Sequence, residues 1–217
     1  MKIVVEKSEN VKILDGIQAR VSEFLKPLGF RKKGRTFNRE TAEGGIFQVV
    51  HFQTGPYELA PEIPPFRMNL YGKFTVNLGV LIKELYDFED WHKPTKFYQE
   101  LYCQARTRLP ALLYGKDVWW NLNEGVDNLA SIVIDGLKSV GFRYFALYET
   151  RTLFRENYGN LNDAPPRAKL DIALLVLHAD RVEGERLFRE YYQGEHQNPG
   201  HIDYLKTLAN RIGIKLI

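Results

Sequence analysis

The chain has 217 residues and a mass of 25.2 kDa, enough for one large domain or two small ones. Hydrophobic residues make up 44% of it, charged residues 26% and aromatic residues 13%, which excludes a disordered, collagen-like or low-complexity chain. The formal net charge of +3 gives the whole molecule little general attraction for nucleic acid or membranes.

The cysteine content and the first residues of the chain indicate the cellular compartment in which we expect the protein. The single cysteine, Cys103, excludes an internal disulfide and a cysteine-rich zinc module, and it favours a reducing compartment. Only three consecutive apolar residues precede Glu6, too few for the apolar part of a secretory signal peptide. We therefore expect a cytoplasmic protein that does not bind membranes.

The start of the chain predicts a helix followed by antiparallel strands. Apolar residues recur at helical spacing from Val11 to Leu28, with Ser8 or Asn10 as the N-terminal cap and Gly29 as a left-handed end. Both alternating faces of the third predicted strand are apolar, which favours a strand covered on both sides. The predicted strands are residues 30–32, 35–40 and 46–53, with turns at 33–34 and 42–45.

The clearest alternating pattern lies at residues 66–80, where even positions are apolar and odd positions are polar. It predicts a strand with one core face and one polar face, bent at Gly72 because its length exceeds the usual range. The polar face is the best candidate for a protein-binding surface, since a regular strand presents it rigidly; alternatively, the helical tail covers it. This face comprises Arg67, Asn69, Tyr71, Lys73, Thr75 and Asn77.

The second half of the chain predicts helices. Residues 84–121 show no clear pattern, after which helical spacing returns at 126–140, capped by Asn123 and ended by Gly141. Residues 25–31 and 137–143 are similar in sequence, which we interpret as a shared helix-ending motif. Further helices are predicted at 144–158, 165–178, 182–192 and 202–212.

Together these elements predict an α+β fold, with an N-terminal helix and antiparallel β-sheet followed by a helical C-terminal part. The predicted regions are 1–121 and 122–217, packed as one compact unit. Trp119 and Trp120 cannot easily share one buried face of a strand. We therefore expect one tryptophan in the core and the other as an anchor for a partner; alternatively, both seal the junction of sheet and helices.

A short basic stretch, joined by two later arginines, gives a second candidate site. Such a set could bind phosphate or nucleic acid, or it could be a solvated sheet edge that discourages aggregation. Residues 29–36 nearly match a phosphate loop, but a helix precedes them and a strand follows, the reverse of the required order. The candidate phosphate-binding residues are Arg31, Lys32, Lys33, Arg35, Arg39, Arg106 and Arg108.

Catalytic and metal-binding constellations are incomplete in the sequence. Cys103 with His51 or His92 could form a nucleophile and base, although a lone cysteine is more often a small buried hydrophobe. The five histidines are scattered, without the spacing of a metal site. We expect no cofactor and no metal.

Several motifs resemble, in order, the bacterial family called domain of unknown function forty-three hundred and four, over about residues 8–140. They are LKPLGFRKKGRTF, QVVHFQ, KFTVNLGV, the group Cys103, Arg106 and Arg108, and Asp117 to Trp120. The resemblance implies no activity and no catalytic residues. Small bacterial α+β proteins of this kind often occur beside toxin systems as immunity proteins, which favours a non-catalytic protein-binding function. Nucleic-acid or phosphate binding is the alternative, and a cysteine-dependent enzyme the third possibility.

Overall fold

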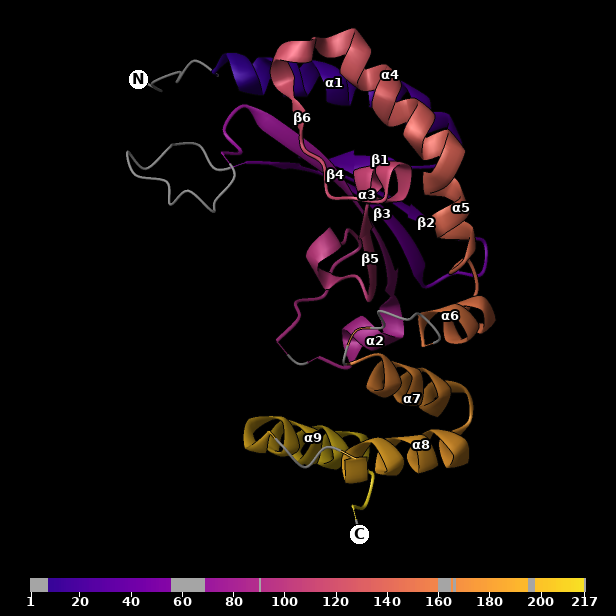
Figure 1. Cartoon of the computed structure of the whole chain (residues 1–217). Coiled ribbons are helices and arrows are strands. Elements are labelled where there is room, and N and C mark those ends of the chain that lie inside the picture. The colour runs from indigo at the N-terminus through magenta and orange to yellow at the C-terminus, as the bar shows by residue number, and fades with distance from the viewer. Residues whose placement is uncertain are drawn as a thin grey trace, which may run out of the picture. The chain divides into compact units, whose positions relative to one another are not determined.

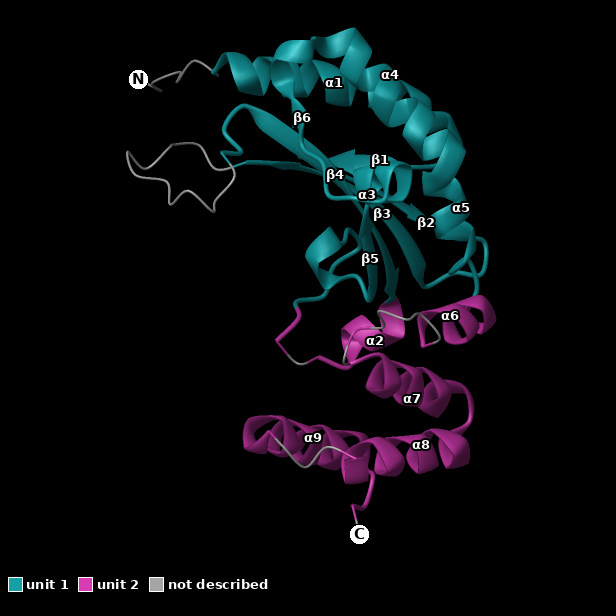
Figure 2. Cartoon of the chain, viewed as in Figure 1, with its two compact units in different colours: residues 1–82, 93–150 teal, residues 83–92, 151–217 magenta. Residues whose placement is uncertain are grey.

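The computed structural model describes residues 8–55, 69–89, 91–159, 165, 167–194 and 198–216. The chain forms two compact units, the first of residues 1–82 and 93–150 and the second of residues 83–92 and 151–217 (Figure 2). The predicted α+β class is confirmed. The boundary differs from the predicted one at 121/122, because the helices at 126–146 belong to the first unit and residues 83–92 to the second.

The first unit is built on an antiparallel sheet in the order β1-β2-β3-β4-β5, with β6 also paired to β4 (Figure 1). Its described strands are β1 (Arg31–Lys33), β2 (Thr36–Glu40), β3 (Ile46–Thr54), β4 (Lys73–Ile82), β5 (Ala105–Arg108) and β6 (Trp120–Asn121). Its helices are α1 (Glu9–Leu25), α3 (Leu109–Tyr114), α4 (Val126–Gly136) and α5 (Phe142–Ala146), with 3-10 turns at Lys26–Leu28, Glu100–Tyr102 and Leu122–Glu124.

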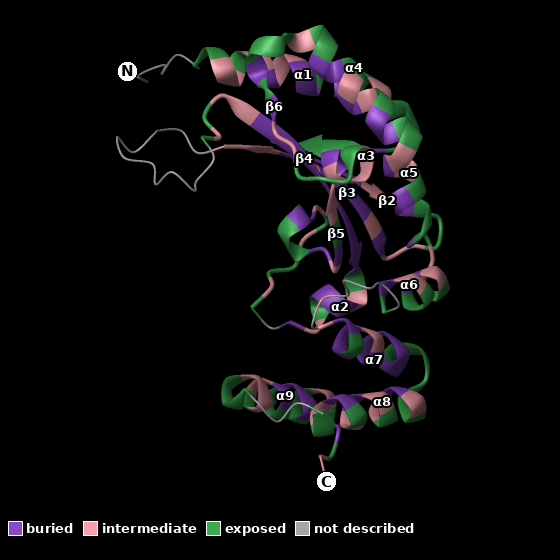
Figure 3. Ribbon diagram, viewed as in Figure 1, coloured by how far each residue is buried: buried purple, intermediate pink, exposed green. Residues whose placement is uncertain are grey.

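Helices α1 and α4 lie over one face of this sheet and enclose the core (Figures 1 and 3). Leu14, Ile17 and Val21 of α1 are completely buried, as are Leu129 and Val133 of α4. Burial of one such side chain contributes about 1.5–3 kcal/mol, so this face supplies much of the stability of the unit. The predicted first helix, its left-handed end and the three strands that follow are confirmed.

Strand β4 is shorter than the predicted strand at 66–80. It begins at Lys73, after a turn in which the Lys73 amide donates to the Leu70 carbonyl (3.1 Å) and Gly72 has φ +68°. The bend at Gly72 is confirmed, but Asn69 and Tyr71 precede the strand, and residues 66–68, which include Arg67, lie outside the described residues.

The predicted helix ends in the middle of the chain are wrong at two places. Gly141 has φ −63°, and the chain runs from α4 through a π-helical turn (Leu137–Gly141) into α5 without stopping. A Cβ at Gly141 would lie 3.5 Å from Leu78 and 3.6 Å from Leu109, so the glycine allows close packing there instead of a left-handed turn. Residues 144–158 are likewise not one helix, because α5 ends at Ala146 and α6 begins at Arg151.

The cap of the central helix also differs from the prediction. Asn121, and not Asn123, forms a capping box with Glu124 on the 3-10 turn that precedes α4. Gly125 then connects that turn to the helix. The sequence does contain a capping signal, but its first residue is Asn121, two residues before the predicted cap, and it caps the 3-10 turn.

The second unit is helical and includes a segment from the middle of the chain. A buried ion-pair network holds this segment, since Arg167 bridges Glu89 (2.5 Å) and Asp171 (2.8 Å), and the Tyr204 hydroxyl donates to Glu89 (2.8 Å). Its helices are α2 (Lys83–Asp87), α6 (Arg151–Tyr158), α7 (Ala168–Ala179), α8 (Arg181–Gly194) and α9 (Pro199–Ile212). Within the described ranges, no helix is both long and apolar enough to span a membrane.

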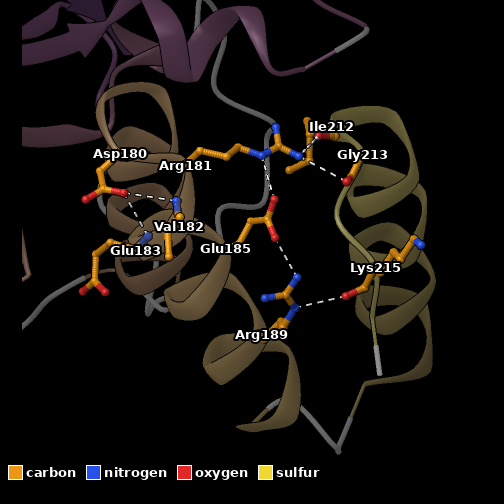
Figure 4. Close-up of polar contacts among 9 residues, drawn as sticks. All are labelled: Asp180, Arg181, Val182, Glu183, Glu185, Arg189, Ile212, Gly213 and Lys215. Atoms are coloured by element: carbon orange, nitrogen blue, oxygen red, sulfur yellow. Dashed lines mark hydrogen bonds and ion pairs between the residues drawn. The ribbon is translucent and has the colours of Figure 1, made fainter.

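Arg181 and Arg189 of α8 donate hydrogen bonds to backbone carbonyls near the C-terminus (Figure 4). The Arg181 guanidinium donates to the carbonyls of Ile212 (2.9 Å) and Gly213 (3.1 Å) at the end of α9, where a cation is favoured by the helix dipole. Arg189 donates to the Lys215 carbonyl (3.0 Å), and Glu185 bridges the two arginines. The predicted helices of the tail are confirmed, with Asn198 as the cap of α9.

Candidate functional site

The strand register places one polar residue from each of five strands in a line across the sheet. Directly paired residues point to the same face, so the line lies on one side of the sheet. Leu78, next to Asn77 in β4, points to the other face, toward Gly141. We call this line the polar row; it comprises Lys33, Thr36, His51, Asn77 and Arg108.

Hydrogen bonds link members of the polar row. The Thr36 hydroxyl and His51 Nδ1 are 2.8 Å apart, and Arg108 Nε donates to Asn77 Oδ1 (3.3 Å). The Asn77 amide nitrogen donates to Gln53 Oε1 (2.9 Å). Burial lowers the pKa of His51 below its usual range, with Glu100 opposing this shift, so the imidazole is neutral at pH 7.

The segments that contain Tyr98 and Val118 cross this face, one on each side of the polar row. On one side, Asn38 exchanges hydrogen bonds with the backbone of Tyr98 (2.8 and 2.6 Å). On the other, the Thr75 hydroxyl donates to the Val118 carbonyl (3.4 Å). Thr75 is completely buried and Asn77 nearly so, which means that the predicted exposed polar face of β4 does not exist at these two residues.

The two adjacent tryptophans occupy different environments, as expected. Trp120 is 5% exposed and packs against Phe74, with ring centroids 5.5 Å apart. Trp119 is only half-buried, and the Arg108 guanidinium lies over its ring, 5.2 Å from the centroid. Trp120 therefore belongs to the core, and Trp119 is the tryptophan available to a partner.

Exposed apolar and aromatic side chains lie at both ends of β5. Leu101 and Tyr102 belong to the 3-10 turn before the strand, which Arg106 ties to it through an ion pair with Glu100 (2.5 Å). Tyr114 ends α3, the helix that follows the strand. The exposed fractions of Leu101, Tyr102 and Tyr114 are 55%, 37% and 47%. We use the name β5 surface for the following set of residues: Leu101, Tyr102, Arg106, Arg108, Tyr114 and Trp119.

The candidate phosphate-binding residues do not form one patch. Alternation along β1 places Arg31 and Lys33 on the face of the polar row and Lys32 on the other, over the Phe37 ring. Arg39 is part of the fold, because it donates to Gln48 (2.9 and 2.5 Å) and to the Leu28 carbonyl (3.2 Å). Arg106 and Arg108 are paired with Glu100 and Asp117, and Arg35 donates to the Thr54 hydroxyl (2.7 Å).

Cys103 has the surroundings of a structural cysteine. Its thiol is buried, donates to the Gln99 carbonyl (3.9 Å) and packs against Gly79, where a Cβ would lie 2.6 Å from the sulfur. Burial, together with the negative charge of Glu100, raises the pKa of the thiol well above its usual range. A thiol that stays protonated and inaccessible is a poor nucleophile.

The histidines proposed as partners of Cys103 are engaged elsewhere. His51 contacts Thr36, and His92, in the second unit, stacks on Tyr86 with ring centroids 4.0 Å apart. The contact of Thr36 and His51 resembles a nucleophile and base, but Thr36 is itself buried. Among the described residues, no group of three or more histidine, cysteine or acidic side chains could hold a metal ion.

Comparison with known proteins gives one match. A family model described as "Domain of unknown function (DUF4304)" matches residues 21–139, more than half of the chain, which confirms the resemblance seen in the motifs. The match includes every strand of the sheet and the whole β5 surface. No curated protein and no solved structure matches the sequence.

Proposed function

The chain belongs to the family of the domain of unknown function DUF4304, and from this premise, which assigns no activity, we propose that it is a non-catalytic module that binds another protein. The observation that carries the proposal is the half-exposed stack of Arg108 on Trp119, within the β5 surface. Arginine, tryptophan and tyrosine are the residues in which the binding energy of protein interfaces concentrates. We further propose a cytoplasmic location and, by analogy of class, neutralisation of a toxin as an immunity protein does.

The β5 surface is held in place before any partner arrives. Arg108 is fixed by three neighbours, Arg106 is tied to Glu100, and Trp119 follows directly on the segment that covers Thr75. A rigid surface loses less conformational entropy on binding than a flexible one, so more of its contact energy is available as affinity. The exposed Leu101 and Tyr102 extend this surface with apolar area.

Nucleic-acid binding is the second candidate, since seven basic residues were predicted to act together. The described contacts give it less support, because Arg39, Arg106 and Arg108 already pair within the protein. Its signature would be a steep fall of affinity with salt, by about 0.7–0.9 log units per log unit of salt for each phosphate contact.

The test is to isolate a stoichiometric protein complex of the tagged full-length chain from its own host, and to measure its affinity by calorimetry. Trp119→Ala and Tyr102→Ala are each expected to weaken that affinity by at least ~2 kcal/mol, about thirtyfold. Leu28→Ala removes an exposed apolar side chain of the first unit outside the β5 surface, and Val182→Ala one of the second unit. Neither control should change affinity by more than about twofold.

Circular dichroism of each variant would confirm that the fold is kept. The proposal fails if no protein partner is recovered, or if Trp119→Ala binds the recovered partner as tightly as the unaltered chain does. A salt-sensitive complex with nucleic acid and no protein would favour the second candidate. A toxin as the recovered partner would support the immunity role, and any other protein would leave binding intact but exclude that role.

A further inference from the structure

The Arg108 guanidinium is oriented by three groups, and its Nη2 remains available as a hydrogen-bond donor. Its Nε donates to Asn77, its Nη1 pairs with Asp117, and its Cζ lies over the Trp119 ring, 5.2 Å from the centroid. Within the described part of the chain, Nη2 makes no hydrogen bond or ion pair. The side chain is 32% exposed, so a ligand can reach this edge of the guanidinium from solvent.

We infer that Arg108 is a receptor for a single carboxylate of a partner protein, and that Asp117 occupies part of this receptor when the partner is absent. This inference rests on the proposed function and names the chemistry that the β5 surface recognises. A guanidinium presents a planar fork of donors that matches the two oxygens of a carboxylate, and stacking on an indole holds the fork in one orientation.

Asp117 has the position of a replaceable ligand. It lies on the segment between α3 and β6, its side chain is 52% exposed, and its described contact is the one with Arg108. An exposed ion pair of this kind contributes little, so an incoming carboxylate can displace it at small cost. Arg108 would keep the contacts with Asn77 and Trp119 throughout, which preserves its orientation.

The surrounding charges favour one carboxylate over a polyanion. Arg106 and Arg108 are each matched by a carboxylate, Glu100 and Asp117, so neither arginine adds an unpaired positive charge to β5. A nucleic acid would need several cations in a line to release counterions, and it would be repelled by Glu100 and Asp117. A single carboxylate requires only the Arg108 fork, and the adjacent Trp119 suits the apolar surroundings of such a group in a protein interface.

The experiment follows the side-chain Nε–Hε signal of Arg108 in the ¹⁵N-labelled full-length protein by NMR. Potassium acetate is added, with potassium chloride at equal ionic strength as the reference. We expect the Arg108 signal to shift saturably with acetate and not with chloride. Arg143, an exposed arginine of α5 outside the β5 surface, serves as the internal control and should respond equally to both salts.

Asp117→Asn gives the decisive variant, because it removes the competing carboxylate from an exposed segment. It should lower the acetate concentration for half-saturation by about threefold, whereas loss of a structural ion pair would lower affinity instead. The inference is overturned if acetate shifts Arg108 in neither protein, or if Asp117→Asn weakens the response. It is also overturned if an oligothymidylate shifts Arg108 at lower concentration than a glutamate-rich peptide does.

The same variants separate this inference from the proposed function. In the isolated complex, Arg108→Lys keeps the charge but loses the planar fork, and we expect about tenfold weaker binding. If Trp119→Ala disrupts the complex but Arg108→Lys does not, the protein-binding function stands and the carboxylate receptor fails. If neither variant has an effect, the binding surface lies elsewhere and both fail.

Discussion

Gly29 and Gly141 occupy equivalent positions in two similar stretches of sequence, yet their backbones have opposite hands, with φ of +86° at Gly29 and −63° at Gly141. The phenylalanines that follow them come together in space. The Arg39 guanidinium lies 4.8 Å from the ring centroid of Phe30 and 5.7 Å from that of Phe142. The two stretches thus contribute one ring each to a single cation–π cluster, although only the first ends a helix.

The glycine difference predicts different costs for the same substitution. Gly29→Ala places a Cβ in the left-handed region, which should lower the free energy of unfolding by about 1–2 kcal/mol. Gly141→Ala fits a helical backbone, and its tightest contact is the flexible end of Leu137 at 3.0 Å. We expect a smaller loss there, and urea unfolding of both variants would check it. A larger loss at Gly141 would contradict the assigned backbone conformations.

Arg39 should behave as a structural residue and not as a ligand-binding one. Its substitution by alanine removes hydrogen bonds to Gln48 and to the Leu28 carbonyl as well as both ring contacts. We expect a loss of about 2 kcal/mol in the free energy of unfolding. Arg143→Ala, which removes an exposed arginine from α5, should cost less than about 0.5 kcal/mol. Equal stability of the two variants in urea titrations would refute this role.

Local patterns explain which parts of the fold could be predicted. The apolar spacing and final glycine of α1, the alternating residues of β4 and the Asn-Pro start of α9 all lie within one element, so the sequence shows them directly. Strand β5 has the sequence Ala-Arg-Thr-Arg, which lacks an apolar alternation. It is a strand because β4 pairs with it, and that pairing is visible only in three dimensions.

The candidate site was predicted in part for the same reason. The different environments of Trp119 and Trp120 could be expected from the sequence, because two adjacent residues of an extended segment point to opposite sides. The polar row is formed across strands, so it depends on a register that no single segment contains. The segment 83–92 joins the second unit because Glu89 pairs with Arg167, which is 78 positions later in the chain.

The burial of Cys103 predicts slow alkylation in the folded protein. Its exposed fraction is 6% and its pKa is raised by burial, so both access and thiolate content are low. Iodoacetamide at pH 8 should react at a small fraction of the rate seen in urea. Ser131→Cys combined with Cys103→Ala supplies an exposed thiol on α4 as the control. Comparable rates for Cys103 and Cys at this control position would reopen the enzyme hypothesis.

Asp171 in the second unit carries a pH dependence whose sign follows from its surroundings. Burial raises the pKa of this carboxyl above its ordinary value of 3.8, and the nearby Glu89 adds to the shift. Arg167 and the Tyr158 hydroxyl, which donates to Asp171 (3.0 Å), oppose it without cancelling it. The folded state therefore holds the proton more tightly than the unfolded state does.

Because the folded pKa is raised, the stabilisation from protonated Asp171 is fully present below pH 3.8 and is lost as the pH rises through the folded pKa. Asp171→Asn cannot titrate, so the stability of the unaltered chain relative to this variant should fall with rising pH across that window. Thermal unfolding followed by circular dichroism between about pH 4 and 7 would measure the difference. A relative stability that rises with pH would show that Arg167 outweighs the desolvation of Asp171.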